Sequence, residues 1–270
     1  MLDKFIHVNS IGQVMHIGSD VFVNYNDLRD FTWDVQSTNE RINKFSKGIV
    51  KKTIPLICFQ KDRNAIFEHF EIDILNHKAG YFEINGYKLY CFAVGNKKSD
   101  YLIDDRFIRI DLEFTSDKPF WMKKTSFTLK QSQPVVLTSE NNPKKYKYNY
   151  PYRYTSNKQK LEAVNGALGY SDVIIRMFGP CSNPFVNING KIYKVNANLE
   201  ADEYFEINTE ERTVAKVSST GERTNAYMFR DKSEVNFFAK VPSGLLTIAS
   251  SDMTSSEVVV LERRSEPKWN

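Results

Sequence analysis

Histidines are the side chains of this chain best suited to metal or acid-base chemistry. There are four, His7, His16, His69 and His77, and all lie in the first half. His69 and His77 are eight residues apart, whereas two ligands on one helix face are three or four apart. We therefore expect solvent-exposed or helix-capping histidines. Because no histidine follows His77, the second half has no Ser-His-Asp or Cys-His site of its own.

Adjacent carboxylates occur at Asp104-Asp105 and Glu210-Glu211. Neighbouring residues of a strand point to opposite faces, and in turns both usually face water. A glycosidase needs two carboxylates that face one sugar bond, an alternative that the sequence leaves open. The chain has no phosphate-binding loop, dinucleotide fingerprint or GxSxG motif. We therefore predict no catalysis, no cofactor and no metal.

One basic, aromatic segment, "KKYKYNYPYRY" from Lys144 to Tyr154, has a composition that could bind a ligand. Basic residues interleaved with rings hold single-stranded nucleic acid, and tyrosines also stack on sugars. The plainer interpretation, which we favour, is an extended segment whose tyrosines pack while its lysines face water. If the segment binds a ligand, the candidate residues are Tyr148, Tyr152, Arg153 and Tyr154.

The composition predicts a mainly β protein with two domains. The 270 residues suffice for two domains of about 130 residues each, both large enough to bury a core. The 19 Phe and 14 Tyr fall mostly in alternating runs, and rings pack well on a pleated sheet. Three cysteines in unrelated contexts are a poor disulfide framework. Cys58 and Cys91 are expected to be buried strand residues in a protein made in a reducing cytoplasm.

The termini and apolar runs predict a soluble chain without a signal peptide. The longest apolar runs, such as Val258 to Leu261, are far shorter than the roughly 20 residues that span a bilayer. The net charge of +4 is only a weak indication of affinity for anionic surfaces.

In the first half we expect strands and one substantial helix. Strands are predicted at Phe31 to Ser37 and at Ile49 to Phe59, where Pro55 indicates an edge position or a bulge. The helix is predicted from an N-cap at Asp62 to a stop at Gly80. A hairpin turning at Asn85-Gly86 follows, since this pair readily takes positive φ, and then an alternating strand from Phe107 to Phe114.

Near Lys130 to Pro134 the amino-acid composition becomes polar, and prolines interrupt the sequence. This change places the domain boundary between residues 132 and 133. Domains of 1–132 and 133–270 follow. Strands after the boundary are predicted at 173–178, 185–188, 191–195, 203–207, 213–217, 235–241, 245–250 and 257–263. Short strands with regular turns are typical of a β-sandwich.

Two hairpins are predicted within "SNPFVNINGKIYKVNANLEADEYFEINTEERTV", Ser182 to Val214. Asn189-Gly190 closes the first, and Asn208 suits an Asx-type turn that closes the second. Ile207 is predicted to face the core of the second domain. The segment carries strands and turns but no reactive side chain.

The order of several short motifs in the chain resembles that of a known family. Asn183-Pro184, Ile188-x-Gly190, the run Glu203 to Ile207, Arg212-Thr213-Val214 and Val241-Pro242-x-Gly244 occur in an order similar to that of the distal tail proteins of long-tailed bacteriophages of Gram-positive hosts. "FTSDKPFW", Phe114 to Trp121, is similar to the end of that family's N-terminal domain. Asp202 and Asn208 depart from the family's usual Gly and Asp, both by turn-compatible exchanges.

The resemblance implies a structural protein of the virion. Its N-terminal β-rich domain would form a six-membered ring, and its C-terminal domain would be a galectin-like β-sandwich outside the ring. The ring would join the tail tube to the tail-tip hub and to baseplate or receptor-binding proteins, and DNA would pass through its lumen without specific binding. The alternative is a carbohydrate-binding β-sandwich protein, although the galectin motif His-x-Asn-x-Arg is missing. Nucleic-acid binding through Lys144 to Tyr154 is a third hypothesis.

A closed ring requires a heterologous interface, whose core favours aromatic side chains and Arg. In the first domain the candidates are Trp33, Arg41, Phe45 and Trp121. For each tryptophan, ordinary core packing remains an open alternative.

Overall fold

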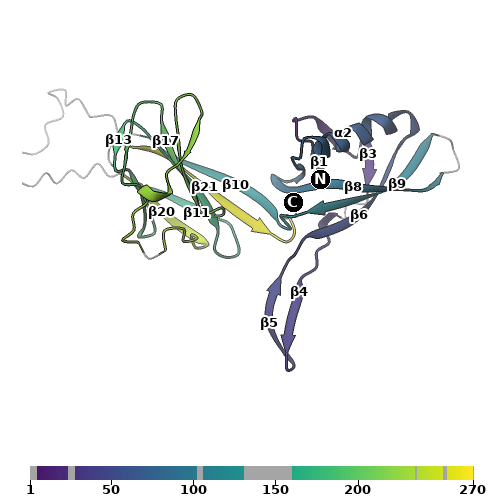
Figure 1. Cartoon of the computed structure of the whole chain (residues 1–270). Coiled ribbons are helices and arrows are strands. Elements are labelled where there is room, and N and C mark those ends of the chain that lie inside the picture. The colour runs from purple at the N-terminus through teal and green to yellow at the C-terminus, as the bar shows by residue number, and fades with distance from the viewer. Residues whose placement is uncertain are drawn as a thin grey trace, which may run out of the picture. The chain divides into compact units, whose positions relative to one another are not determined.

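The computed structural model describes residues 5–23, 28–101, 106–130, 160–234, 236–251 and 254–269. The chain divides into two compact units (Figure 1). Unit 1 comprises residues 1–123 and 263–270, and unit 2 comprises residues 124–262. In the described part, strands predominate and one helix is of substantial length, which confirms the prediction of a mainly β fold.

Seven strands of unit 1 close into a barrel. They hydrogen-bond in the order β8-β7-β1-β2-β3-β6-β9, and β9 pairs again with β8. Closure of a sheet on itself removes free strand edges. The bounds are β1 Phe5–Val8, β2 Val14–Ile17, β3 Val21–Val23, β6 Val50–Phe59, β7 Gly80–Ile84, β8 Tyr87–Tyr101 and β9 Phe107–Ser116.

Alternation along the strands sorts the side chains of this barrel. In β9, Ile108, Ile110, Leu112 and Phe114 are buried, as the alternating pattern predicts. They join one core with side chains from every other strand of the barrel and with Trp121. Cys58 and Cys91 are buried in the same core, which confirms their assignment as buried strand residues.

The predicted turn at Asn85-Gly86 is confirmed. Asn85 has φ 52° and Gly86 has φ 78°, and β7 pairs with β8 on either side of them. The predicted edge position of Pro55 is confirmed, since β3 does not pair with this residue, and the alternative of a bulge is wrong. Strand β6 lies between β3 and β9, and its register with β9 passes through Pro55 without interruption. The pairing of β3 begins only at Leu56, so the missing N–H of Pro55 removes no bond to β3.

Helix α2, Arg63–Leu75, follows the short 3-10 helix η1, Gln60–Asp62. Asp62 occupies the predicted N-cap position, although its side chain makes no capping hydrogen bond. The helix ends at Leu75, before the predicted stop, and Gly80 begins β7 instead. Ile66, His69, Phe70 and Asp73 form its buried face. These residues recur every three or four positions, which is the spacing of one helix face, and two of them are polar.

Unit 2 is a β-sandwich of two sheets around one core. One sheet has the order β19-β18-β17-β12-β21-β10, and the other has the order β11-β20-β14-β15. Side chains of both sheets meet in this core. The bounds are β10 Trp121–Leu129, β11 Lys160–Asn165, β12 Asp172–Phe178, β14 Phe185–Ile188, β15 Lys191–Lys194, β17 Tyr204–Asn208, β18 Thr213–Val217, β19 Arg223–Asn225, β20 Gly244–Ser250 and β21 Ser255–Arg264.

Most strands predicted for the second half are confirmed, with one exception. Residues 236–241 form turns instead of the predicted strand, and Val241 makes only an isolated bridge with Ser171. In this loop Phe237 is buried and packs against Tyr193, so its apolar residues serve the core without strand geometry. Strand β11 lies in a stretch whose polar composition concealed it. The remaining short elements are β13 Cys181–Ser182, β16 Asn198–Leu199 and η2 Tyr227–Phe229.

Both hairpins predicted within Ser182 to Val214 are confirmed. Asn189 and Gly190, at φ 49° and 86°, connect β14 to β15. In the second hairpin the Asn208 Oδ1 atom accepts hydrogen bonds from the backbone N–H groups of Glu210 and Glu211, which is the predicted Asx-type turn. Ile207 is 0% exposed and lies in the core of unit 2.

Within the ranges described above, no helix has the length and apolar character needed to cross a bilayer.

Candidate assembly surface

A two-stranded arm extends from the barrel of unit 1 (Figure 1). It consists of β4, Asp34–Thr38, and β5, Arg41–Ser46, which pair with each other and with no other described strand. The turn between them places Asn39 and Glu40 at positive φ. Every residue of the two strands is exposed except the half-buried Ser46. An isolated two-stranded sheet is only marginally stable in water, so this arm is a surface that lacks a partner within its own unit.

The register of the arm places its apolar side chains on one face. Val35 lies opposite Phe45, and Ser37 lies opposite Ile42. Directly opposed residues share a face, and positions 35 and 37 of β4 share one as well. A bulge between these two pairs accommodates Asn43 as an extra residue of β5. The hairpin face, defined as Val35, Ile42 and Phe45, is thus continuous, with side chains 51%, 58% and 60% exposed.

A lysine surrounded by three rings lies at the base of the arm. The Lys47 Nζ atom is 4.9 Å from the ring centroid of Phe31 and 5.0 Å from those of Trp33 and Phe120. Attraction of the ammonium group to the ring faces stabilises this arrangement, and burial lowers the pKa of Lys47. Within the described residues Lys47 makes no ion pair, so its ammonium group is held by the three rings.

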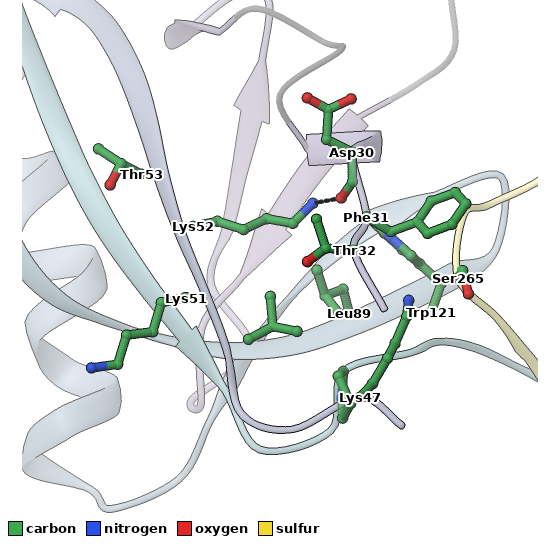
Figure 2. A pocket seen from close by; sticks show the side chains of 12 residues that line it. Asp30, Phe31, Thr32, Lys47, Lys51, Lys52, Thr53, Leu89, Trp121 and Ser265 are labelled. Atoms are coloured by element: carbon green, nitrogen blue, oxygen red, sulfur yellow. Dashed lines mark hydrogen bonds between the residues drawn. The ribbon is translucent and has the colours of Figure 1, made fainter. Parts of the chain in front are cut away.

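Beside Lys47 is a pocket of about 280 Å³ (Figure 2). Lys52 enters it and donates hydrogen bonds to the backbone carbonyls of Leu28, at 2.8 Å, and of Asp30. Trp121 forms part of the wall. The volume is slightly below the range typical of small-molecule sites, and the Lys52 ammonium group is engaged by backbone. Lys52 therefore connects the segment that precedes the arm to strand β6 of the barrel.

Three of the four predicted interface residues lie on or beside this arm. Arg41 and Phe45 are on β5, Trp33 directly precedes β4, and all three are exposed. Trp121 is 1% exposed and belongs to the core of unit 1. It therefore packs in the core, which was the alternative left open for each tryptophan. The candidates of the basic segment, Tyr148, Tyr152, Arg153 and Tyr154, lie outside the described residues.

Sequence reasoning missed Val35, Ile42 and Lys47. Val35 could have been predicted from the sequence, because "FTWDVQS" alternates and places Val35 on the same strand face as Trp33. Ile42 and Phe45 are three residues apart, a spacing that puts two residues of a regular strand on opposite faces. Only the bulge brings them together.

The prediction of exposed or capping histidines is confirmed for His16 and His77, which are exposed, and is wrong for the other two. His7 and His69 are buried, and the His7 Nδ1 atom lies 2.9 Å from the His69 Nε2 atom. Burial, and then the neighbouring His69, hold the pKa of His7 well below its usual range. Burial also lowers the pKa of His69, although the Asp73 carboxylate opposes the shift. Phe70 and Phe82 pack against the His7 ring, so this pair is part of the core.

No group of three or more His, Cys, Asp or Glu side chains able to hold a metal occurs among the described residues. Of the carboxylate pairs considered from the sequence, Asp104-Asp105 lies outside the described residues. Glu210 and Glu211 lie in the turn after β17, and the Asn208 side chain caps both backbone N–H groups.

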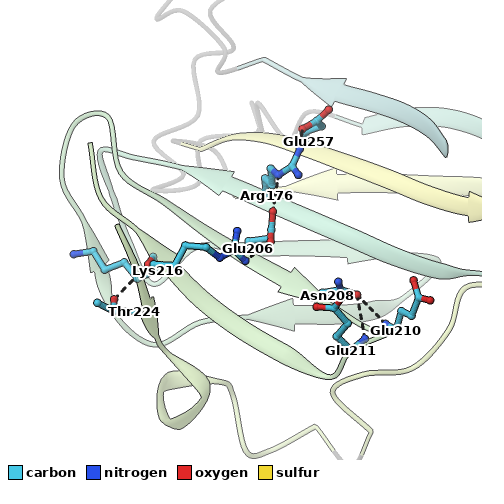
Figure 3. Close-up of polar contacts among 9 residues, drawn as sticks. Arg176, Glu206, Asn208, Glu210, Glu211, Lys216, Thr224 and Glu257 are labelled. Carbon is cyan, nitrogen blue, oxygen red and sulfur yellow. Dashed lines mark hydrogen bonds and ion pairs between the residues drawn. The ribbon is translucent and has the colours of Figure 1, made fainter. Parts of the chain in front are cut away.

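One polar cluster crosses a sheet of unit 2 (Figure 3). Arg176 donates to the Glu206 carboxylate at 2.8 Å and to the Glu257 carboxylate at 2.9 Å, and Arg223 donates to Glu206 at 2.6 Å. Burial alone raises the pKa of Glu206, but the bonds from Arg223 and Arg176 outweigh it and lower the pKa. A general acid needs a raised pKa. The cluster is therefore suited to connecting strands and unsuited to donating a proton.

Replacing Glu206 with Gln is expected to destabilise unit 2 by about 1–3 kcal/mol, because two charge-assisted hydrogen bonds are lost from a nearly buried group. Chemical denaturation followed by circular dichroism measures the change. Glu162→Gln is the matched control, since Glu162 pairs with Lys160 in full exposure and such pairs contribute little. Equal stability of the two variants would show that the Arg176 cluster contributes nothing to folding.

No family model and no curated protein matches this chain. Three solved structures have a similar fold over almost its whole length. The Dit protein of phage SPP1, described as a paradigm of the hub adsorption apparatus in phages that infect Gram-positive bacteria, is 11% identical with a TM-score of 0.56. The match covers 98% of this chain and 100% of that one.

The other two are structures of the phage P2 baseplate in its activated conformation, one with Ca and one with Sr. In both, the matching chain is 12% identical with a TM-score of 0.59, over 99% of this chain and 100% of that one. At this identity the likeness establishes the fold alone. The resemblance to phage distal tail proteins read from the sequence is confirmed at that level.

Proposed function

We propose that this chain, which has the fold of phage hub and baseplate proteins, is a structural protein of a phage tail tip that assembles as a six-membered ring. Unit 1 forms the ring, and unit 2 forms a galectin-like sandwich outside it. The ring joins the tail tube to the tail-tip hub and to baseplate or receptor-binding proteins, and DNA passes through its lumen without specific binding. The protein is made in the bacterial cytoplasm and resides in the virion.

The exposed arm of unit 1 carries this proposal. Monomeric proteins rarely leave a continuous apolar surface in water, and here such a surface lies on a ribbon that needs support. Aromatic and Arg side chains are enriched in interface cores. Trp33, Arg41 and Phe45 place both types on or beside the arm. In a chain with a hub-protein fold, a neighbouring copy supplies the missing partner.

The polar cluster of unit 2 also favours a structural role. Its carboxylates are neutralised by Arg176 and Arg223, and the turn holding Glu210 and Glu211 is fixed by Asn208. These contacts stabilise a sandwich that presents surfaces to other proteins. The alternative of carbohydrate binding relied on Tyr152 and Tyr154, which lie outside the described residues. No observation on the described residues supports it.

Purified protein is expected to form particles of six copies at micromolar concentration, with six-fold symmetry in electron micrographs. Phe45→Asp places a charge on the hairpin face, and we expect it to lower the assembly constant at least tenfold, since desolvating a charge at an interface is costly. Light scattering measures the mass. Leu245→Asp is the matched control, because Leu245 is an exposed leucine of unit 2. A parent protein that stays monomeric at all concentrations contradicts the proposal.

A further inference from the structure

A second apolar feature of unit 1 complements the arm. Helix α2 and strands β8 and β9 enclose a groove of about 230 Å³, the α2 groove, whose apolar lining includes Phe67, Ile74, Val94 and Leu112. Ile74 and Val94 are exposed at its mouth, as is the adjacent Leu75. The volume is below that of typical small-molecule pockets. The groove is therefore suited to receive protein side chains.

We propose that the hairpin face of one copy lies in the α2 groove of the next copy. The inference rests on the proposed ring and names the two surfaces that form it. Val35, Ile42 and Phe45 of one copy contact Phe67, Ile74 and Val94 of its neighbour. The arm gains the apolar support that its own unit does not provide.

The two surfaces match in length. The six residues of β5 extend over about 20 Å at the usual rise of a strand. The 13 residues of α2 also extend over about 20 Å at the rise of a helix. A ribbon lying along the helix can therefore place its apolar side chains in the groove over its full length.

Both surfaces carry exposed charged side chains. The arm from Asp34 to Ser46 has two basic and two acidic side chains, and the exposed charged side chains of α2 are Arg63, Glu68 and Glu71. Arg41 and Lys44 of the arm, like Glu68 and Glu71 of the helix, are exposed and make no ion pair within the described residues. In the register of the arm, Arg41 and Lys44 lie opposite Thr38 and Gln36, on the other face of the ribbon from the hairpin face. Their long stems must therefore reach past the edge of the ribbon for the charges to meet the helix. Contact between the two surfaces places these four charges along one boundary.

The pairing of unlike surfaces also fits a ring. When one patch of a chain meets a different patch of the next copy, the contact is heterologous, and such contacts form closed rings if the rotation closes. A self-complementary contact between two arms stops at a dimer. The proposed contact uses each surface once in every copy.

Cysteine cross-linking tests the contact directly. In a Cys181→Ser background, Phe45→Cys is combined with Val94→Cys, and the assembled protein is oxidised. The native Cys58 and Cys91 are buried, so they do not interfere. We expect a ladder of covalent multimers on a non-reducing gel, and at least tenfold less cross-linking in either single variant.

The control pair is Phe45→Cys with Val14→Cys, since Val14 is exposed on β2 outside the groove. If rings form but the groove pair gives no more ladder than this control, the α2 groove is not the receiving surface, although the ring stands. If the parent protein is monomeric at every concentration, both proposals fail.

Charge reversal gives a second readout. Arg41→Glu with Lys44→Glu is expected to lower the assembly constant at least tenfold. Adding Glu68→Lys and Glu71→Lys is expected to restore most of the assembly constant, because opposite charges again face each other across the contact. Loss of assembly without restoration in a variant that melts like the parent would place the basic side chains against a different surface.

Discussion

Replacing Ile207 with Asp is expected to unfold unit 2 at temperatures where the parent is folded. Ile207 is 0% exposed and pairs across the sheet with Ile175 and Val214, both of which belong to the same core. A carboxylate there has no basic partner among these neighbours, and burying a polar group without one costs several kcal/mol. A domain is stable by roughly 5–15 kcal/mol in total, so this single change removes a large share of its stability.

The three tryptophans make the measurement selective. Trp33, Trp121 and Trp269 all belong to unit 1. Circular dichroism follows both units, whereas tryptophan fluorescence follows unit 1. We expect the dichroism transition of unit 2 to fall by roughly 10 °C or more. Leu245→Asp makes the same exchange at a side chain 61% exposed and is expected to change stability by less than about 1 kcal/mol. Similar melting of the two variants would mean that Ile207 does not face the core.

Acidification is expected to destabilise unit 1 through the His7–His69 pair. At neutral pH one ring donates its N–H to the other ring's lone pair, over 2.9 Å. Protonation of the acceptor brings two N–H groups face to face in a buried site. Since the folded-state pKa of both rings is lowered, unfolding takes up protons below pH about 6.5. Stability is thus fully present above that pH and is lost as pH falls.

The expected loss is about 1.4 kcal/mol per pH unit for each proton taken up, or roughly 2 kcal/mol for His7 alone between pH 6.5 and 5. Thermal melts followed by tryptophan fluorescence between pH 7.5 and 5 measure it. The double variant His7→Phe, His69→Met removes both rings and is expected to flatten the dependence, whereas His16→Gln, at an exposed position, is expected to retain it. An equally steep dependence in the double variant would assign the effect to other groups.

Local chemistry made parts of the fold predictable. The turns at Asn85-Gly86 and Asn189-Gly190 each depend on two adjacent residues that take positive φ. The turn at Asn208 depends on its side chain, which accepts a hydrogen bond from the backbone N–H two residues ahead. Closure of the barrel has no such signal. It depends on pairing between β6 and β9 and between β1 and β7, whose partners lie far apart in the sequence.

The candidate surface was predictable only in part, for a related reason. Trp33, Arg41 and Phe45 stand out by residue type, but the hairpin face depends on the bulge that admits Asn43. The buried histidines were missed because His69 shares a helix face with Ile66 and Phe70 but meets His7 only in three dimensions. A polar residue at an apolar position of a helix indicates that it has a buried polar partner, but the sequence does not identify which residue that partner is.

The chain leaves unit 1 after Lys123 and returns to it at Arg263. The two crossings lie in β10 and β21, which are neighbours in one sheet. Unit 2 is thus an insertion whose entry and exit lie side by side, the arrangement in which one domain is accepted inside another with little disturbance. We therefore expect that a short linker in place of residues 124–262 leaves the barrel able to fold by itself.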